Sequence, residues 1–212
     1  FSKYIGESRQ LYLTTNYRSA NAIVNAGNAL MNGRGKPAHA QDESLGSVYI
    51  VDMDGFKPSS LESELHPGDV ITPVVLRICG KCLEDGLDIV MLSRKHTLPY
   101  YVNAPAHVTA QRDDLGWFLE SIRSHIPKDM KNRVTISTAH GYKGLEKRAV
   151  IILDAIERSY PVLHPDWIFF KLFGDDLEKI IDEERRLFYV SMTRAKDELF
   201  IVTETRQKTQ YL

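Results

Sequence analysis

The sequence predicts a doubly wound α/β domain with a mainly parallel sheet and helices on both of its faces. Short apolar runs alternate along the chain with segments of helical periodicity. The runs at 134–137 and 149–153 are continuously apolar rather than alternating, which is typical of parallel strands covered on both faces. Of the 212 residues, 43% are hydrophobic, which is enough to build a sizeable buried core.

The first part of the chain predicts a strand, a helix and a second strand. The strands are expected at 11–14 and 48–51, where short apolar runs are bounded by polar residues. Between them, Ser19 is placed to cap a helix. The apolar face of that helix is expected to consist of Ile23, Ala26, Gly27 and Leu30.

A second helix is expected between a proline and a glycine. Thr72 and Pro73 are suited to its N-cap and first position, and Gly86 stands where a helix C-terminus favours glycine. Cys79 and Cys82 fall on its apolar stripe. A structural zinc site needs four ligands and the chain has no second cysteine pair, so both residues are interpreted as buried, reduced thiols. A strand at 89–92 follows.

The second part of the chain begins with an irregular segment at 95–112, which contains two prolines. Asp113 or Asp114 is expected to cap the next helix. After the apolar runs at 134–137 and 149–153, a final helix at 177–190 leads into a strand at 199–202.

The final helix carries a carboxylate within its apolar stripe. That stripe consists of Ile180, Ile181, Leu187 and Phe188, and Glu184 falls inside it. Because a buried carboxylate must be paired to be tolerated, Glu184 is expected to contact an arginine and to hold the segment in place.

Composition and charge restrict the class of protein. The 27 basic and 28 acidic residues nearly cancel, so any contact with nucleic acid must be local. No apolar run approaches the roughly 20 residues that a membrane span needs, and a signal-peptide pattern is absent at the start. The sequence therefore predicts a cytoplasmic protein with no membrane contact.

Two arginines flank predicted strands far apart in the chain. In a doubly wound sheet, ligands bind beyond the carboxyl ends of the strands, so the polar segments at 16–19, 138–146 and 183–196 are expected at one edge. Arg18 and Arg194 are candidates for a shared anion, because a guanidinium offers a planar fork of donors that fits phosphate oxygens. Tyr17 offers a flat face suited to stacking on a base.

The three segments, read in order, resemble the last three motifs of the UvrD/Rep/PcrA helicases of superfamily 1. They are Asn-Tyr-Arg-Ser at 16–19, Thr-Ala-His-Gly-Tyr-Lys-Gly-Leu-Glu at 138–146, and the segment at 183–196 that ends in Thr-Arg-Ala-Lys. The resemblance covers almost the whole chain. It implies that residues 1–212 form the second RecA-like domain of an ATP-dependent DNA helicase.

The resemblance implies roles for four residues in binding ATP. Tyr17 packs on the adenine, and Arg18 contacts the γ-phosphate. Glu146 lies near the ribose. Arg194, in Thr-Arg-Ala, acts as an arginine finger that stabilises the charge developing during phosphoryl transfer.

The resemblance also implies a track for single-stranded DNA. Thr138 and His140 are expected near the DNA backbone. Lys143 is a further candidate for DNA contact, with pairing to an acidic neighbour as its alternative. Gly141 and Gly144 fit a tight passage in which backbone amides face a phosphate.

Several departures from the family limit what the chain is expected to do alone. It has no Gly-x-x-x-x-Gly-Lys-Ser/Thr phosphate loop and no paired acidic residues after a strand to hold Mg²⁺. The first RecA-like domain is therefore expected to belong to a larger protein, to hold Mg²⁺ and to be a partner of this one. The interval from Leu92 to Val134 is also too short for most of the helical insertion that better-known members carry.

Two other interpretations stay open. The chain is alternatively the equivalent domain of a helicase–nuclease or repair subunit, or a catalytically inactive helicase-like scaffold that binds DNA or protein. The joint presence of Tyr17, Arg18, Glu146 and Arg194 favours a working motor, because a scaffold has no physical need for two arginines that face phosphate.

Overall fold

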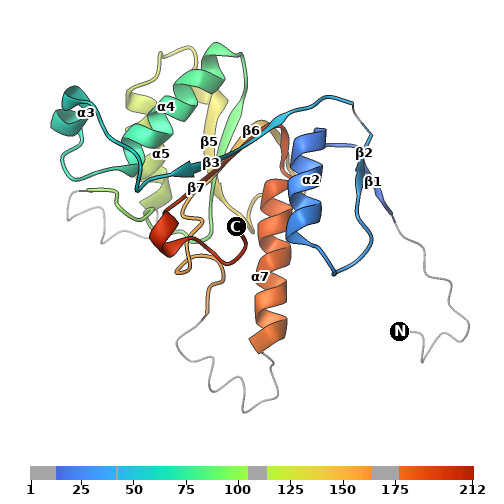
Figure 1. The fold of residues 1–212 in the computed structure, drawn as a ribbon. Helices are drawn as coiled ribbons and strands as arrows, with labels where there is room; N and C mark the ends of the chain where they lie inside the picture. The colour runs from blue at the N-terminus through green and yellow to red at the C-terminus, as the bar shows by residue number, and fades with distance from the viewer. Residues whose placement is uncertain (1–12, 42, 105–113, 164–176) are drawn as a thin grey trace, which may run out of the picture.

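A parallel sheet of five strands forms the centre of the computed structural model, which describes residues 13–41, 43–104, 114–163 and 177–212. All neighbouring strands of this sheet run parallel. In order across the sheet, they are β3 (Ser47–Asp52), β7 (Ala195–Thr203), β6 (Lys147–Ile152), β4 (Ile89–Ser93) and β5 (Val134–Thr138). Two short parallel strands, β1 (Thr15–Asn16) and β2 (His39–Ala40), form a separate sheet to one side (Figure 1).

Helices cover both faces of the five-stranded sheet (Figure 1). α4 (Ile71–Glu84) and α5 (Asp114–Ser124) pack on one face, and α2 (Asn21–Leu30) and α7 (Leu177–Met192) pack on the other. Successive residues of each strand point to opposite faces, so each strand contributes to both apolar layers. The predicted doubly wound α/β fold is confirmed.

Strand β4 shows how the two layers are built. All five of its residues are buried. Ile89 and Met91 belong to the cluster under α4 and α5, whereas Val90 and Leu92 belong to the cluster under α2 and α7. This arrangement accounts for the continuous apolar run, because neither face of a central strand meets water.

The first helix begins later than the sequence predicted. Ala20 is its N-cap residue and no side chain caps the helix, so the expected cap at Ser19 is wrong. Ser19 is instead buried in the turn that precedes α2. The side-chain oxygen of Asn16 accepts hydrogen bonds from the amides of Arg18 (2.8 Å) and Ser19 (2.9 Å), and so takes these amides before the helix starts.

The expected cap of the second helix is also wrong. α4 begins at Ile71, so Thr72 and Pro73 both lie inside its first turn. Asp69 provides the acceptors: one carboxylate oxygen accepts from the Thr72 amide at 2.9 Å and the other from the Thr72 hydroxyl at 2.7 Å. A carboxylate is a stronger acceptor than a hydroxyl, which explains why the helix starts earlier. Gly86 follows the helix in the left-handed region, as expected.

Two strands differ from their predictions. The strand expected at 11–14 begins only at Thr15, and residues 11 and 12 lie outside the described part of the chain. β5 was expected to be covered on both faces. It is an edge strand, and its three central residues, 135–137, are only partly buried.

Other expectations hold for the described residues. Cys79 and Cys82 are free and buried in α4, and burial raises the pKa of each thiol to about 12. Residues 95–104 form no helix or strand, while 105–113 lie outside the described ranges. The expected cap of the next helix is not confirmed, because Asp113 lies outside these ranges and Asp114 is the first residue of α5 rather than its cap.

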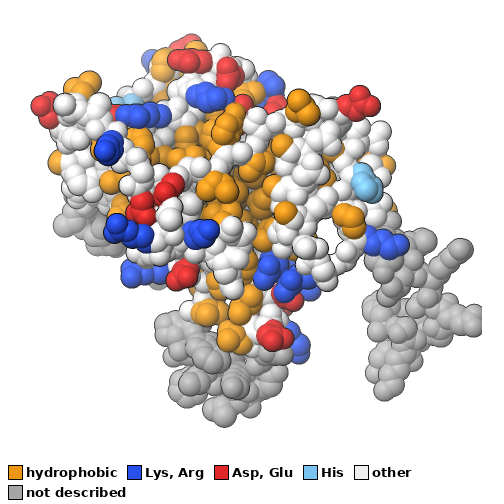
Figure 2. Space-filling view, viewed as in Figure 1, with side chains coloured by type: hydrophobic (Ala, Val, Ile, Leu, Met, Phe, Trp, Pro, Cys, Tyr) orange, Lys and Arg blue, Asp and Glu red, His pale blue; other side chains and the backbone are white. Residues whose placement is uncertain are grey.

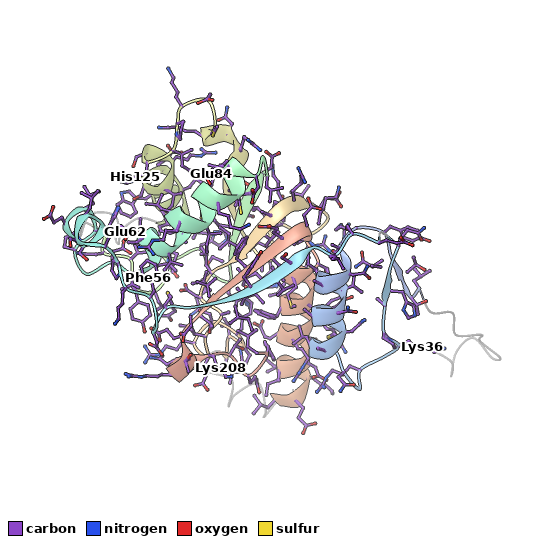
Figure 3. The ribbon with its side chains drawn as sticks, turned by 45° about the horizontal axis from the view of Figure 1, so that its top comes forward. Lys36, Phe56, Glu62, Glu84, His125 and Lys208 are labelled. Carbon is purple, nitrogen blue, oxygen red and sulfur yellow. The ribbon has the colours of Figure 1, made fainter. Side chains whose placement is uncertain are left out.

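A short helix, α3 (Ser60–Leu65), is attached to the outside of α4. The Glu62 carboxylate accepts hydrogen bonds from the amide of Ser59 at 2.6 Å and from Arg77 at 2.6 Å. Arg77 also lies over the ring of Phe56, at 4.7 Å from its centre. Figure 3 shows Glu62 and Phe56 together on this side of the molecule, opposite Lys36 beside the small sheet.

Charges are interspersed on the face of the molecule that Figure 2 shows. Lysine and arginine side chains lie among aspartate and glutamate side chains, with no continuous basic field on this face. The described part of the chain also contains two 3₁₀ turns, η1 (Lys131–Arg133) and η2 (Thr205–Gln207). In the part of the chain that the structure describes, no helix is long and apolar enough to cross a membrane.

Candidate functional site

The three polar segments do not all meet at the carboxyl ends of the strands, as the sequence predicted. Thr138 ends β5 at the carboxyl edge, beside Ser93 at the end of β4. Glu146 and Arg194, in contrast, immediately precede β6 and β7, whose pairing begins at Lys147. A segment that flanks a strand can lie at either end of it, and only the folded chain decides which.

The loop at 139–146 links the two edges. Tyr142 is buried in the apolar cluster under α2 and α7, and its hydroxyl donates a hydrogen bond to the carbonyl of Glu146 at 3.2 Å. Burial raises the pKa of this hydroxyl. Gly144 adopts a left-handed conformation with φ of 87°, which suits glycine. The loop thus returns the chain from the carboxyl edge to the amino edge.

At the amino edge, Glu146 binds two cations from distant parts of the chain. One carboxylate oxygen lies 2.6 Å from Nε of Arg18, and the other lies 2.6 Å from Nζ of Lys196. The hydrogen bonds from Lys196 and then Arg18 lower the pKa of Glu146 to about 2. Arg18 and Glu146 were predicted to share one site, whereas Lys196, which directly follows the Thr-Arg-Ala motif, had no predicted role.

Arg194 is held by backbone carbonyl groups rather than by a carboxylate. Its Nε donates to the carbonyl of Val190 at 3.0 Å, and its Nη1 donates to the carbonyl of Leu145 at 3.2 Å. Burial and then the charge of Arg18 lower the pKa of Arg194. The two predicted arginines line the same pocket, and an anion placed between them would relieve their repulsion.

A pocket of about 390 Å³ opens beside these residues. Tyr17 borders it with a side chain that is 77% exposed. The turn that carries Tyr17 is fixed by Asn16, so an open aromatic face is presented by a rigid backbone. The residues that line the pocket are Leu13, Thr15, Asn16, Tyr17, Arg18, Ala38, Tyr189, Val190, Thr193 and Arg194.

A second pocket, of about 280 Å³, lies further along α7 and shares Val190 with the first. Its lining includes His140 and Lys143, two of the predicted DNA contacts, together with Arg186. Burial, then the charges of Arg94 and Lys143, lower the pKa of His140. A neutral imidazole can both donate and accept a hydrogen bond.

Thr138, the third predicted DNA contact, uses its side chain within the loop. Its hydroxyl oxygen accepts a hydrogen bond from the amide of Gly141 at 3.0 Å. The threonine is buried, whereas His140 and Lys143 are exposed. The Gly141 amide is thus already paired with Thr138.

Glu184 was predicted to meet an arginine, and the structure shows that this arginine is Arg94, which directly follows β4. Nε and Nη2 of Arg94 lie 2.9 and 2.6 Å from the two oxygens of the carboxylate, in a fork-to-fork pair. The amide of Val162 donates to the same carboxylate at 3.2 Å. Glu184 therefore joins α7 to the carboxyl edge of the sheet, and the expectation of a paired, structural carboxylate is confirmed.

Asp154 is a buried carboxyl group that was not predicted. It lies two residues beyond β6 in a left-handed conformation, with φ of 51°. Burial raises its pKa to about 7, although the amide of Tyr100 donates to both of its oxygens at 3.1–3.2 Å. The signal for it in the sequence is an acidic residue placed directly after a continuous apolar run.

Within the described ranges, no three metal-binding side chains are grouped to hold an ion.

The five-stranded parallel sheet with helices on both faces defines an α/β protein, and Arg18, Glu146 and Arg194 lie together at one edge of it. Residues 103–206 match the family profile of the UvrD-like helicase C-terminal domain. The chain is thus similar, over about half of its length, to the C-terminal domain of UvrD-like DNA helicases, and it is also similar to bacterial proteins named as DNA helicases.

Similar proteins include several bacterial helicases. The chain is 29% identical over 200 residues to a "Probable DNA helicase" of Mycoplasma pneumoniae, covering 92% of this chain and 32% of that protein. It is 42% identical over 81 residues to "ATP-dependent DNA helicase Rep" of Buchnera aphidicola subsp. Schizaphis graminum, covering 38% of this chain and 11% of that protein. This chain thus spans about a third or less of the length of these relatives.

One of the solved structures also matches this chain. It is the C-terminal domain of a "possible DNA helicase" from Lactobacillus plantarum WCFS1, with a TM-score of 0.49 and 16% sequence identity. The similarity covers 92% of this chain and 91% of that one.

Proposed function

We propose that this domain is the second RecA-like motor domain of an ATP-dependent DNA helicase and acts with a first RecA-like domain in the same protein. The observation that carries the proposal is the cluster of Arg18, Glu146 and Arg194 beside a pocket bordered by the exposed Tyr17. The phosphate loop and the ligands of Mg²⁺ would belong to the first domain. ATP would bind between the two domains and couple their movement to single-stranded DNA.

Each residue of the cluster has a chemical role in this proposal. Tyr17 offers its ring to the adenine, and Arg18 offers its guanidinium to the γ-phosphate. Glu146 is the acceptor for ribose hydroxyl groups. Arg194 supplies positive charge to the phosphoryl group during transfer, and its two bonds to backbone carbonyls keep it pre-oriented.

The second pocket fits a segment of the DNA backbone. His140, Lys143 and Arg186 place a hydrogen-bonding imidazole and two cations around one opening. Contacts of this kind track phosphates without reading base sequence. Because residues of α7 line both pockets, a movement of this helix would change the shape of the nucleotide pocket and of the DNA pocket together.

An inactive scaffold is the second candidate, and one observation favours it. Arg18 and Arg194 each already have acceptors within the chain, so neither needs a ligand to be satisfied.

In the alternative of a helicase–nuclease, the same residues would have the same roles in binding ATP and DNA. A relative from Ligilactobacillus salivarius whose name describes an ATP-dependent helicase/nuclease is 32% identical over 104 residues. A nuclease assay on the full-length protein separates that alternative.

We expect the purified 212-residue chain to hydrolyse ATP no faster than a buffer blank, with or without single-stranded DNA, because it lacks a phosphate loop. The full-length protein should show DNA-stimulated hydrolysis, measured as phosphate release. Turnover by the isolated chain would overturn the two-domain proposal. Absence of turnover in the full-length protein would favour the scaffold.

A second test concerns the DNA track. In the full-length protein, His140→Ala should weaken single-stranded DNA binding and reduce its salt dependence, and adding Thr138→Ala should increase the loss. His140 is proposed to contact the backbone directly, whereas Thr138 fixes the loop through Gly141. Fluorescence anisotropy with an oligonucleotide at several salt concentrations measures both effects. His125→Ala, which changes an exposed histidine just after α5 that does not line this pocket, is the matched control. An unchanged salt slope for the double variant would argue for a purely structural role.

A further inference from the structure

Lys196 shares the Glu146 carboxylate with Arg18, and the two ion pairs are equally short. The Nζ–Oε1 and Nε–Oε2 distances are both 2.6 Å. All three side chains are partly exposed, with 42% for Lys196, 39% for Glu146 and 32% for Arg18. One carboxylate therefore holds two cations, and each oxygen has its own.

The two cations differ in what else they can reach. Arg18 lines the pocket beside Tyr17 and Arg194, whereas Lys196 and Glu146 do not line it. Arg18 therefore lies between the Glu146 carboxylate and the pocket in which an anion would bind. Among the described residues, the ion pair of Lys196 is with Glu146, and Lys196 lies at the start of β7, where the backbone is fixed by pairing with β6.

We propose that Lys196 is a positioning residue of the nucleotide site. It holds the Glu146 carboxylate in place when Arg18 leaves that carboxylate for the phosphates of a bound nucleoside triphosphate. The oxygen that Arg18 releases then accepts a hydrogen bond from a ribose hydroxyl. This inference rests on the proposed function.

The exchange is balanced in charge. Before binding, one carboxylate faces two cations; after binding, Arg18 faces phosphate and Lys196 retains the carboxylate. Without Lys196, the departure of Arg18 would leave Glu146 without either of these partners, so the carboxylate would be neither neutralised nor oriented. Lys196 thus couples the recognition of phosphate by Arg18 to the recognition of ribose by Glu146.

A neighbouring ion pair provides a matched control. Nε of Arg148 lies 2.6 Å from a carboxylate oxygen of Asp197, and both side chains are exposed. This pair joins the same two strands, β6 and β7, but neither residue lines the pocket at Arg18. Arg148→Met removes a comparable surface pair without touching Glu146.

The test compares ATP with 2′,3′-dideoxyATP, which lacks the ribose hydroxyls, in DNA-stimulated hydrolysis by the full-length protein. The wild-type KM for ATP should be about tenfold lower than the KM for dideoxyATP, because one or two hydrogen bonds to ribose contribute a factor of about this size. Lys196→Met should reduce this preference to about twofold or less. Lys196→Arg should retain most of the preference, and Arg148→Met should retain all of it.

Three outcomes would overturn the inference. Lys196→Met could keep the preference for ATP, or it could weaken ATP and dideoxyATP equally, which is the result of a purely structural role. A wild-type enzyme that hydrolyses both nucleotides equally well would also remove the inference while leaving the proposed function in place. A full-length protein with no ATP turnover would instead overturn the proposed function itself, and the inference with it.

Discussion

Replacing Arg194 with alanine in the full-length protein should lower DNA-stimulated ATP turnover by about 10³- to 10⁵-fold, the range found for removing an arginine finger. ATP affinity should fall only modestly, because a finger acts chiefly on the transition state. Arg194→Lys should restore little, since an ammonium group cannot reproduce the two directed bonds to Val190 and Leu145 or the planar fork. Steady-state kinetics with varied ATP separates kcat from KM.

The same substitution also removes two internal hydrogen bonds, so stability must be measured beside activity. We expect Arg194→Ala to lower the free energy of unfolding by about 1–3 kcal/mol, which leaves a folded protein. Arg148→Ala, at an exposed pair on the neighbouring strands, is the control for losing an arginine in this region. Near wild-type turnover by Arg194→Ala would remove the proposed mechanism and favour the scaffold.

The largest loss of stability should come from the pair between Arg94 and Glu184. Their side chains are 17% and 11% exposed, so Arg94→Met leaves a largely buried carboxylate without its cation. The free energy of unfolding should fall by about 3–5 kcal/mol, the usual result of breaking a buried pair on one side only. Urea denaturation followed by circular dichroism measures it.

Two further variants test the cause. The double variant Arg94→Met with Glu184→Leu should recover most of the loss, because it removes the unpaired charge together with its partner. Arg34→Met breaks the ion pair between Arg34 and Asp182, which lies on α7 like Glu184. The two atoms are 2.8 Å apart, but the pair is more exposed, so the free energy of unfolding should fall by less than about 1 kcal/mol. If Arg94→Met cost no more than Arg34→Met, the Arg94–Glu184 pair would not be what fixes α7 to the sheet.

The layering of the fold could be predicted because it follows from local patterns. Continuous apolar runs mark strands covered on both faces, and the spacing of apolar residues in 177–190 marks a helix with one buried side. The paired state of Glu184 could be predicted for the same reason, since a carboxylate inside an apolar stripe requires a cation. Helix starts were less predictable, because Asp69 and Asn16 accept hydrogen bonds from the amides of the expected caps, Thr72 and Ser19, themselves.

The candidate site was predictable in its members but not in its geometry. Arg18, Glu146 and Arg194 could be assigned to one site from the sequence because their motifs, read together, resemble those of one family. Their partners could not be assigned, because Lys196 and Glu146 lie 50 positions apart and meet only through the pairing of β6 and β7. Arg94 had no motif to mark it, and its contact with α7 arises from packing.

The sequence by itself determined the class of fold, the buried thiols and the residue types available for phosphate and base, since these depend on pattern and side-chain chemistry. Only the tertiary structure decided where these residues lie. The loop that carries Glu146 crosses from the carboxyl edge to the amino edge of the sheet, with Tyr142 buried under α2 and α7. That crossing places His140 and Arg194 in different pockets along α7. Local sequence patterns could not predict it, because contacts between distant segments fix the path of the chain.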